Sequence, residues 1–175
     1  MTPSEEACRA ALRAAAGEDD GPIERHSERV YLLAIELAGA RDVDRELLHC
    51  AALLHDIGLY DPPGVKEAYV TSGRHLTERV LAEWEPERLH RCADAVEFHH
   101  ELRSQEAKGP EVELIRRADR IEVSQGLLRE GLPREKVREI RSSIPVRGFV
   151  PEVMRGLGRA AVRRPLSLLR IFRPV

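Results

Sequence analysis

The sequence predicts an all-α fold, a single helical domain with a five-helix core. Apolar residues recur at spacings of three and four along most of the chain, which is the period of a helix that buries one face. No run of alternating apolar and polar residues lies between turn signals, as a half-buried strand would require. Prolines, glycines and short polar capping residues divide the pattern into successive helices.

The first core helix carries His26. The string Asp20-Gly21-Pro22 combines a capping residue with a proline in the first turn, and it predicts that a helix begins there. Apolar residues follow on one face until Gly39, and His26 shares this face. We therefore expect its imidazole to point into the domain.

The second core helix leads to the pair His55-Asp56. We expect this helix to begin near Asp42 or Asp44 and to run to Gly58, where a segment rich in proline and glycine stops it. The pair then lies in its last turns. At about 100° per residue, the His55 side chain falls on the apolar side and points into the same interior.

The third and fourth core helices add His75 and the pair His99-His100. Ser72 is expected to cap the third helix, with His75 in its first turn. Pro86 opens the fourth helix, which places the histidine pair near its C-terminal end. Adjacent residues on a helix diverge by about 100°, so at most one of the two imidazoles is expected to be a metal ligand, and the other could reach the substrate.

The fifth core helix follows a polar stretch over residues 103–110 and carries Asp119 on its apolar stripe. An unpaired carboxylate in an apolar interior is costly, so a buried aspartate is normally paired or coordinated to a metal. Asp119 is therefore a candidate ligand. From Pro133 onward the pattern weakens, and we expect only a short helix from about Glu135 to Ser142.

A length of 175 residues, of which 42% are hydrophobic, fits one domain with a buried core. We expect an N-terminal helical or flexible segment (1–20), a metal-binding core (21–130) and a basic C-terminal extension packed on the same domain (131–175). Between residues 147 and 175, seven arginines and one glutamate give a net charge of +6. Contact of this extension with an anionic membrane, a partner or the substrate is the alternative.

The overall charge and the cysteines exclude several classes of protein. The 28 basic and 30 acidic residues leave a net charge of −2, so we expect no specific nucleic-acid partner. Cys8, Cys50 and Cys92 form no CxxC pair, which argues against disulfides and thiolate metal sites. We see no export signal and no transmembrane segment and expect a cytoplasmic protein. A homo-oligomer is compatible with the sequence.

Five of the seven histidines recur with aspartates at these helical positions and together predict one metal centre. The candidates are His26, His55, Asp56, His75, His99, His100 and Asp119. Neutral imidazoles and carboxylates bind ions such as Zn, Fe and Mn, and several of them on facing elements suit a polynuclear site. The other two histidines, His49 and His90, lie on other faces of their helices and are not expected to be ligands.

The order of these residues, together with the strings ALLHDIG and RRADRIE, resembles the HD-domain superfamily of metal-dependent phosphohydrolases over about residues 22–125. The resemblance is to the binuclear, HDIG-type branch, and it implies a helical bundle that binds two divalent ions (Fe, Mn, Zn, Mg or Ni). It further implies that the first ion is bound by His26, His55, Asp56 and Asp119, and the second by His75 and His99, with Asp56 as the bridge.

The resemblance also implies roles beside the ligands. Asp56 is expected to be catalytic as the bridge, and His100 as the group that contacts the substrate or transfers a proton. Leu59 stands where many related phosphohydrolases have a lysine suited to a phosphate, so Lys66 and Arg103 are the candidates to bind the substrate. The histidine pair starts like the HD-GYP motif of cyclic dinucleotide phosphodiesterases, but no GYP string follows, so a cyclic dinucleotide is not the expected substrate.

These implications lead to a hydrolase that cleaves a phosphate ester or anhydride of a nucleotide or other small metabolite through a metal-bound hydroxide. Three alternatives stay open. They are a mixed-valent di-iron oxygenase, a mononuclear enzyme similar to the cyanamide-hydratase branch, and a metal-stabilised regulatory module whose arginine-rich tail binds a partner. The identity and the number of the bound metals distinguish among them.

Overall fold

The computed structural model describes residues 1–17, 21–61 and 67–148. The expectations for Lys66 and for the arginine-rich tail beyond residue 148 lie outside these ranges. Within them the chain forms α-helices and two short 3-10 helices and no strand, which confirms the all-α prediction. In chain order the elements are α1 (Pro3–Ala16), α2 (Pro22–Ala38), α3 (Arg45–Leu54), η1 (Ile57–Tyr60), α4 (Tyr69–Val80), α5 (Pro86–Phe98), η2 (Glu106–Lys108), α6 (Pro110–Val123) and α7 (Arg134–Ser143).

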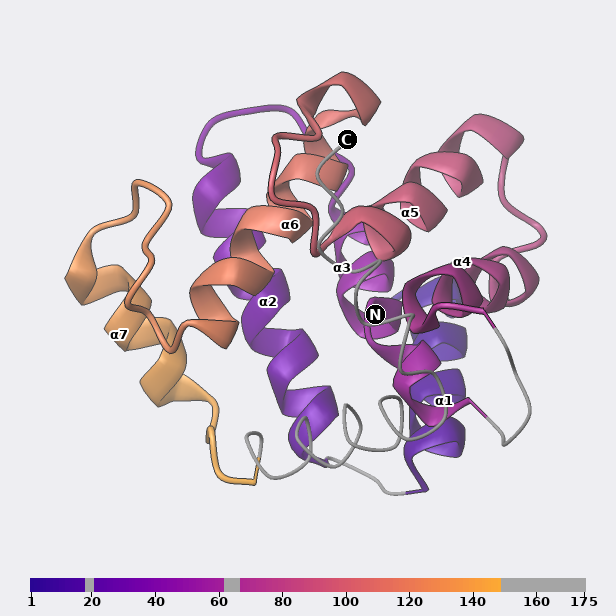
Figure 1. Ribbon diagram of the computed structural model, residues 1–175, viewed down its shortest axis with the longest axis horizontal. Helices are drawn as coiled ribbons and strands as arrows, with labels where there is room; N and C mark the ends of the chain where they lie inside the picture. The colour runs from indigo at the N-terminus through magenta and orange to yellow at the C-terminus, as the bar shows by residue number, and fades with distance from the viewer. Residues whose placement is uncertain (18–20, 62–66, 149–175) are drawn as a thin grey trace.

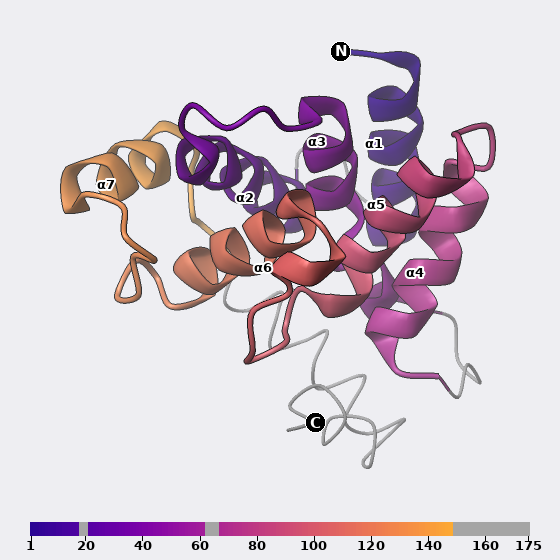
Figure 2. The same ribbon diagram turned by 90° about the horizontal axis from the view of Figure 1, so that it is seen from above.

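The helices pack in a bundle around α3. Helix α2 lies against α3 and α6, α5 lies against α3, α4 and α6, and α1 lies against α3. Figures 1 and 2 show α7 beside α2 at one end of the domain and α4 beside α5 at the other. Among the described helices, none combines the length and the apolar character needed to span a bilayer.

Helix α3 is the centre of the domain because it is buried on all sides. Every residue from Leu47 to Leu54 is inaccessible or nearly so, and α1, α2 and α5 pack around it. A helix without a polar face can only be stable when it is enclosed. Helix α3 therefore carries the residues that follow its last turn, His55 and Asp56, into the interior.

The second core helix stops earlier than predicted, at Leu54 instead of Gly58. His55 is its C-cap, and Asp56 lies in the turn before η1. The chain turns here because η1 packs directly on α4, where a Cβ on Gly58 would lie 2.0 Å from the carbonyl oxygen of Tyr69. His55 and Asp56 thus lie at the end of α3. Their side chains are not confined to the face that the residues inside the helix share.

The helix starts predicted at Pro22, Asp44 and Pro86 are confirmed, and the one predicted at Ser72 is wrong. Asp44 is the N-cap of α3, and its Oδ1 accepts a hydrogen bond from a backbone N–H of the first turn at 2.9 Å. Ser72 is not a cap, because α4 begins at Tyr69 and the Ser72 hydroxyl donates to Asp61 Oδ1 at 2.7 Å. The Ser72 hydroxyl therefore forms a tertiary hydrogen bond and does not cap the first turn of a helix. As a result His75 lies in the second turn of the helix, not the first.

Helix α1 falls in the segment expected to be helical or flexible, residues 1–20. A capping box of Thr2 and Glu5 begins it. His49 in α3 joins α1 to α2, with its Nδ1 2.9 Å from Glu5 Oε1 and its Nε2 3.2 Å from Glu28 Oε1. Two ring nitrogens that both face carboxylates are both donors only in the protonated imidazole. His49 is therefore a cationic clamp among three helices.

Replacing His49 by glutamine is expected to lower the free energy of unfolding by about 2 kcal/mol at pH 6 and by less at pH 9. Burial alone would lower the pKa of His49, but hydrogen bonds to Glu28 and Glu5 outweigh burial and raise it. The clamp therefore stabilises the fold fully below about pH 6.5, where an exposed histidine titrates, and this stabilisation is lost as the pH rises through the raised pKa. Urea unfolding at both pH values measures the difference.

The control is His90→Gln, because the His90 side chain is 67% exposed. This variant is expected to change the free energy of unfolding by less than about 0.5 kcal/mol at either pH. Burial alone would raise the pKa of Glu5 and Glu28, but their hydrogen bonds lower it, so the clamp also weakens in acid as these carboxylates become protonated. An equal deficit of His49→Gln at pH 6 and pH 9 would contradict a cationic clamp.

Candidate metal centre

Four elements bring six of the seven candidate ligands together in the interior. His26 lies in α2, His55 and Asp56 at the end of α3, His99 and His100 at the end of α5, and Asp119 in α6. Within the described ranges their ligand atoms form three overlapping groups, in each of which all atoms lie within 4.8 Å of one another. The groups are His26, His55 and Asp119; His55, Asp56 and His99; and His99, His100 and Asp119.

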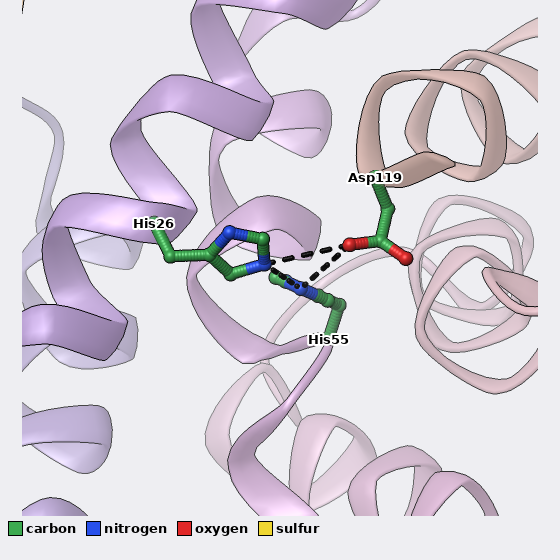
Figure 3. Close-up of side chains that lie close together, drawn as sticks. All are labelled: His26, His55 and Asp119. Atoms are coloured by element: carbon green, nitrogen blue, oxygen red, sulfur yellow. Dashed lines mark hydrogen bonds and ion pairs between the residues drawn. The ribbon is translucent and has the colours of Figure 1, made fainter. Parts of the chain in front are cut away.

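The first histidine pair, His26 and His55, meets both aspartates. Figure 3 shows the two imidazoles and the Asp119 carboxylate converging from three elements. The two Nε2 atoms are 3.0 Å apart, and His26 Nε2 lies 3.4 Å from Asp119 Oδ1. His55 Nε2 lies 3.3 Å from Asp56 Oδ2. Ligand atoms are separated by about this much when each lies about 2.1 Å from a common ion.

The second histidine pair, His99 and His100, meets the other oxygens of the same aspartates. His99 Nε2 lies 3.6 Å from Asp56 Oδ1, and His100 Nδ1 lies 3.3 Å from Asp119 Oδ2. The two rings are 4.0 Å apart between centroids. Each carboxylate thus presents one oxygen to the first pair and one to the second, so both aspartates lie between the two pairs.

Backbone carbonyls at helix ends fix two of the imidazoles. His55 Nδ1 donates to the carbonyl oxygen of Ala52, and His99 Nδ1 to that of Val96, each at 2.7 Å. The last carbonyls of a helix lack an intrahelical partner, which makes them available to a side chain at the C-cap. Because Nδ1 donates to the carbonyl, Nε2 is the nitrogen that faces the centre and can bind an ion once it carries no proton.

The centre combines buried carboxylates with imidazoles whose protonation differs. Burial alone would lower the pKa of His55, but Asp56 and Asp119 raise it to about 9. Burial and the neighbouring His100 lower the pKa of His99 to about 4. Burial alone would raise the pKa of Asp119, but its hydrogen bonds to histidines hold it well below the usual range. The aspartates are therefore ionised, and a metal competes with a proton mainly at His55.

A divalent ion fits this set of residues. In the part of the chain that the structure describes, no lysine or arginine pairs with either aspartate of the centre, although Asp56 is 7% exposed and Asp119 1%. His99 Nε2 and Asp119 Oδ1 are buried atoms without a hydrogen-bond partner among the described residues. Buried charges and unpaired polar atoms are costly unless a metal or a partner satisfies them.

His75, which the sequence placed in the ligand set, is not brought into the centre by the structure. Its side chain is 48% exposed, and its Nδ1 lies 3.0 Å from Glu67 Oε2. Helix α4 buries Gly73 among other residues, and His75 lies two positions, or about 200°, further round the helix. The imidazole consequently lies apart from the ligand groups, in a pocket that Ala11 and Ile57 also line.

The other candidates lie around the centre. Arg103, expected to bind the substrate, is exposed in the loop after α5 and forms no ion pair with a described residue. Leu59 is buried and packs against Tyr69. The Tyr69 ring lies 6.2 Å from the ring of His99 and 5.9 Å from that of His100. The buried ring of Tyr69 therefore packs beside both imidazoles of the second pair.

Glu122 is a residue near the centre to which the sequence assigned no role. It is fully buried, and its Oε1 lies 3.9 Å from His26 Nδ1. The available signal was its spacing of three from Asp119, which places both carboxylates on one side of α6. A second acid on a ligand stripe can only be given a role once its partners are known.

The comparison with known families agrees with this geometry. A family model described as HD domain matches residues 23–124. The match includes all six residues of the three groups and excludes α1 and α7. No curated protein matches the chain.

Proposed function

Since this chain belongs to the HD-domain family, a superfamily of metal-dependent hydrolases, we propose that it hydrolyses a phosphate ester or anhydride of a nucleotide or similar small metabolite. The observation that carries the proposal is the arrangement of two buried aspartates whose four oxygens face two histidine pairs. Such a set suits divalent ions that bind phosphoryl oxygens.

The residues divide into two ion positions in this proposal. His26 and His55 hold the first ion, and His99 and His100 the second, with Asp56 shared as the bridge. Asp119 is a second shared ligand because its two oxygens face different pairs. His100, which the sequence assigned to substrate contact or proton transfer, takes the ligand place that His75 does not reach.

The ions would lower the pKa of a bound water and so supply hydroxide near neutral pH. The protein itself orients the metal ligands, excludes solvent from the centre and provides a path for the substrate. His26, His55 and His99 are fully buried, whereas the His100 side chain is 26% exposed. We therefore propose that the substrate approaches from the side of the second pair, over His100.

The test is phosphate release from a panel of phosphate monoesters, nucleotides and anhydrides, with protein loaded separately with Mn, Fe, Zn, Mg or Ni. We expect at least one class to be hydrolysed, a chelator to abolish the reaction and added metal to restore it. Oxygen uptake by the iron form without phosphate release would favour a di-iron oxygenase. Hydration of a nitrile by a form with one metal would favour a hydratase, and a saturated metal without activity would favour a regulatory module.

A further inference from the structure

His26 differs from the other two fully buried imidazoles in what faces its Nδ1. His55 and His99 lie at helix ends, where backbone carbonyls are available to them. His26 lies inside α2, where the carbonyls take part in the helix's own hydrogen bonds. Its Nδ1 instead faces a carboxylate oxygen, Glu122 Oε1, at 3.9 Å.

Glu122 is held by two arginines. It is 0% exposed, and its Oε1 accepts a hydrogen bond from Arg29 Nε at 2.6 Å. Its Oε2 accepts from Arg141 Nη1, which also donates to the Glu122 carbonyl oxygen at 3.1 Å. Charge-assisted hydrogen bonds on both oxygens fix the carboxylate in one orientation. The carboxylate is therefore held in place through both of its oxygens, and Oε1 is the one that faces His26.

One of these arginines belongs to α7, a helix outside the family match. Arg141 lies in α7, and Arg29 Nη1 donates to the carbonyl oxygen of Pro145, just beyond that helix, at 2.9 Å. Figure 1 shows α7 flanking α2. Its buried apolar residues are only Val137 and Ile140. The polar contacts with Glu122 and Arg29 are thus a large part of the contact between α7 and the bundle.

We propose that Glu122 is a positioning residue for His26, and that α7 supports it through Arg141, so that the added helix sets the metal affinity of the first ion position. At 3.9 Å the contact is electrostatic and not a hydrogen bond; the carboxylate favours the proton on Nδ1 of His26, which leaves Nε2 for the ion and restrains the plane of the ring. Partners of this kind typically change metal affinity by about 10–100-fold. The inference rests on the proposed function, because it requires an ion at the first pair.

A purely structural ion cluster would behave differently. If Arg29, Glu122 and Arg141 served only to pack α7 on α2 and α6, their removal would lower the stability of the fold and leave the affinity of the folded protein for metal unchanged. A positioning role changes the affinity of folded protein. The two roles are separated when metal affinity and metal-free stability are measured on the same variants.

The experiment measures the dissociation constant of Zn²⁺ and Mn²⁺ by competition with a chelator, together with the thermal unfolding of the metal-free protein. Glu122→Gln, which keeps the shape and loses the charge, is expected to weaken binding by about 10–100-fold. Arg141→Met is expected to weaken it by up to about 10-fold. Arg141→Lys, which keeps the charge, is expected to recover most of the affinity.

The matched control on α7 is Lys136→Met. Lys136 pairs with Glu139 on the same helix at 3.1 Å, whereas the ion pairs of Glu122 among the described residues are with His26, Arg29 and Arg141. The variant is expected to bind metal as the wild type does. If Glu122→Gln does not fold, the comparison of Arg141→Met with Arg141→Lys still decides the proposal, because both variants change the partly exposed Arg141 and leave the buried Glu122 in place.

The outcomes separate the inference from the proposed function. Wild-type affinity in folded Glu122→Gln and Arg141→Met, with binding abolished in His55→Ala, would overturn the positioning role and leave the metal centre intact. Metal binding that is unaffected by His55→Ala would overturn the proposed function and, with it, the premise of the inference. Weaker binding in Glu122→Gln and Arg141→Met, recovery in Arg141→Lys and no change in Lys136→Met would support both.

Discussion

Asp56→Ala is expected to remove the bound metal and to lower the rate of phosphate release by more than about 100-fold. The Asp56 carboxylate lies 3.3 Å from His55 Nε2 through one oxygen and 3.6 Å from His99 Nε2 through the other. In the proposed arrangement, its loss would therefore remove one ligand from each ion position and a negative charge near both. Metal content is measured by inductively coupled plasma mass spectrometry on protein purified without a metal-affinity tag, and activity on the substrates that the wild type cleaves.

Two histidine variants distinguish the ligand set in the structure from the one that the sequence implied. His75→Ala is expected to keep both proposed ions, because His75 lies outside the ligand groups and contacts Glu67. His100→Ala is expected to lose about one equivalent, because His100 meets Asp119 at the second position. Loss of one ion in His75→Ala, with both retained in His100→Ala, would restore the predicted set and contradict the proposed one.

Gly58→Ala is expected to lower the free energy of unfolding by about 3–5 kcal/mol. The added Cβ would lie 2.0 Å from the carbonyl oxygen of Tyr69 and 3.1 Å from the amide nitrogen of Gly73. Both are backbone atoms, so relief requires that η1 and α4 move apart. Because Gly58 follows Asp56 by two residues and Tyr69 contacts the second histidine pair, metal affinity is expected to fall as well. Urea unfolding and metal competition measure the two effects.

Gly17→Ala is the control for the clash. A Cβ on Gly17 would meet nothing within 4 Å, but its φ of 75° is left-handed, so the substitution costs about 1 kcal/mol of backbone strain and no overlap. Its metal affinity should equal that of the wild type. A loss of stability in Gly58→Ala no larger than that in Gly17→Ala would mean that η1 and α4 are not locked together as the structure has them.

The peripheral helices have separate connections to the part of the bundle that the family model matches. Helix α1 is attached through the His49 clamp, on the side of α3 away from the centre. Helix α7 is attached through Glu122, which faces a ligand of the centre. Both helices lie outside the family match. We therefore expect changes in α1 to act on stability and changes at Arg141 to act on the metal.

Much of the fold follows from local patterns in the sequence. The period of three and four gave the helices that carry His26 and Asp119, and both side chains are buried as predicted. Capping chemistry placed the start of α3 at one of its two candidate residues, Asp44. These predictions hold because the face that a residue occupies on a helix depends only on its neighbours along the chain.

The helix boundaries were harder to predict where tertiary contacts compete with local ones. The Ser72 hydroxyl binds Asp61 and not its own helix end, so α4 begins a turn earlier than the sequence suggested. Helix α3 stops before Gly58 because η1 lies against the backbone of α4. Neither contact is visible in a local pattern, since each joins segments that are brought together only by packing.

The sequence by itself determined that this is a helical domain whose inward histidines and aspartates can bind metal, because helix period, caps and ligand chemistry are properties of short stretches of chain. Only the tertiary structure decided which of them meet. His75 carries the right chemistry and lies outside the ligand groups, His100 meets Asp119, and Glu122 lies between His26 and two arginines. These relations depend on how distant helices pack against one another, and the distance between two side chains on different helices is set by that packing and not by their spacing in the sequence.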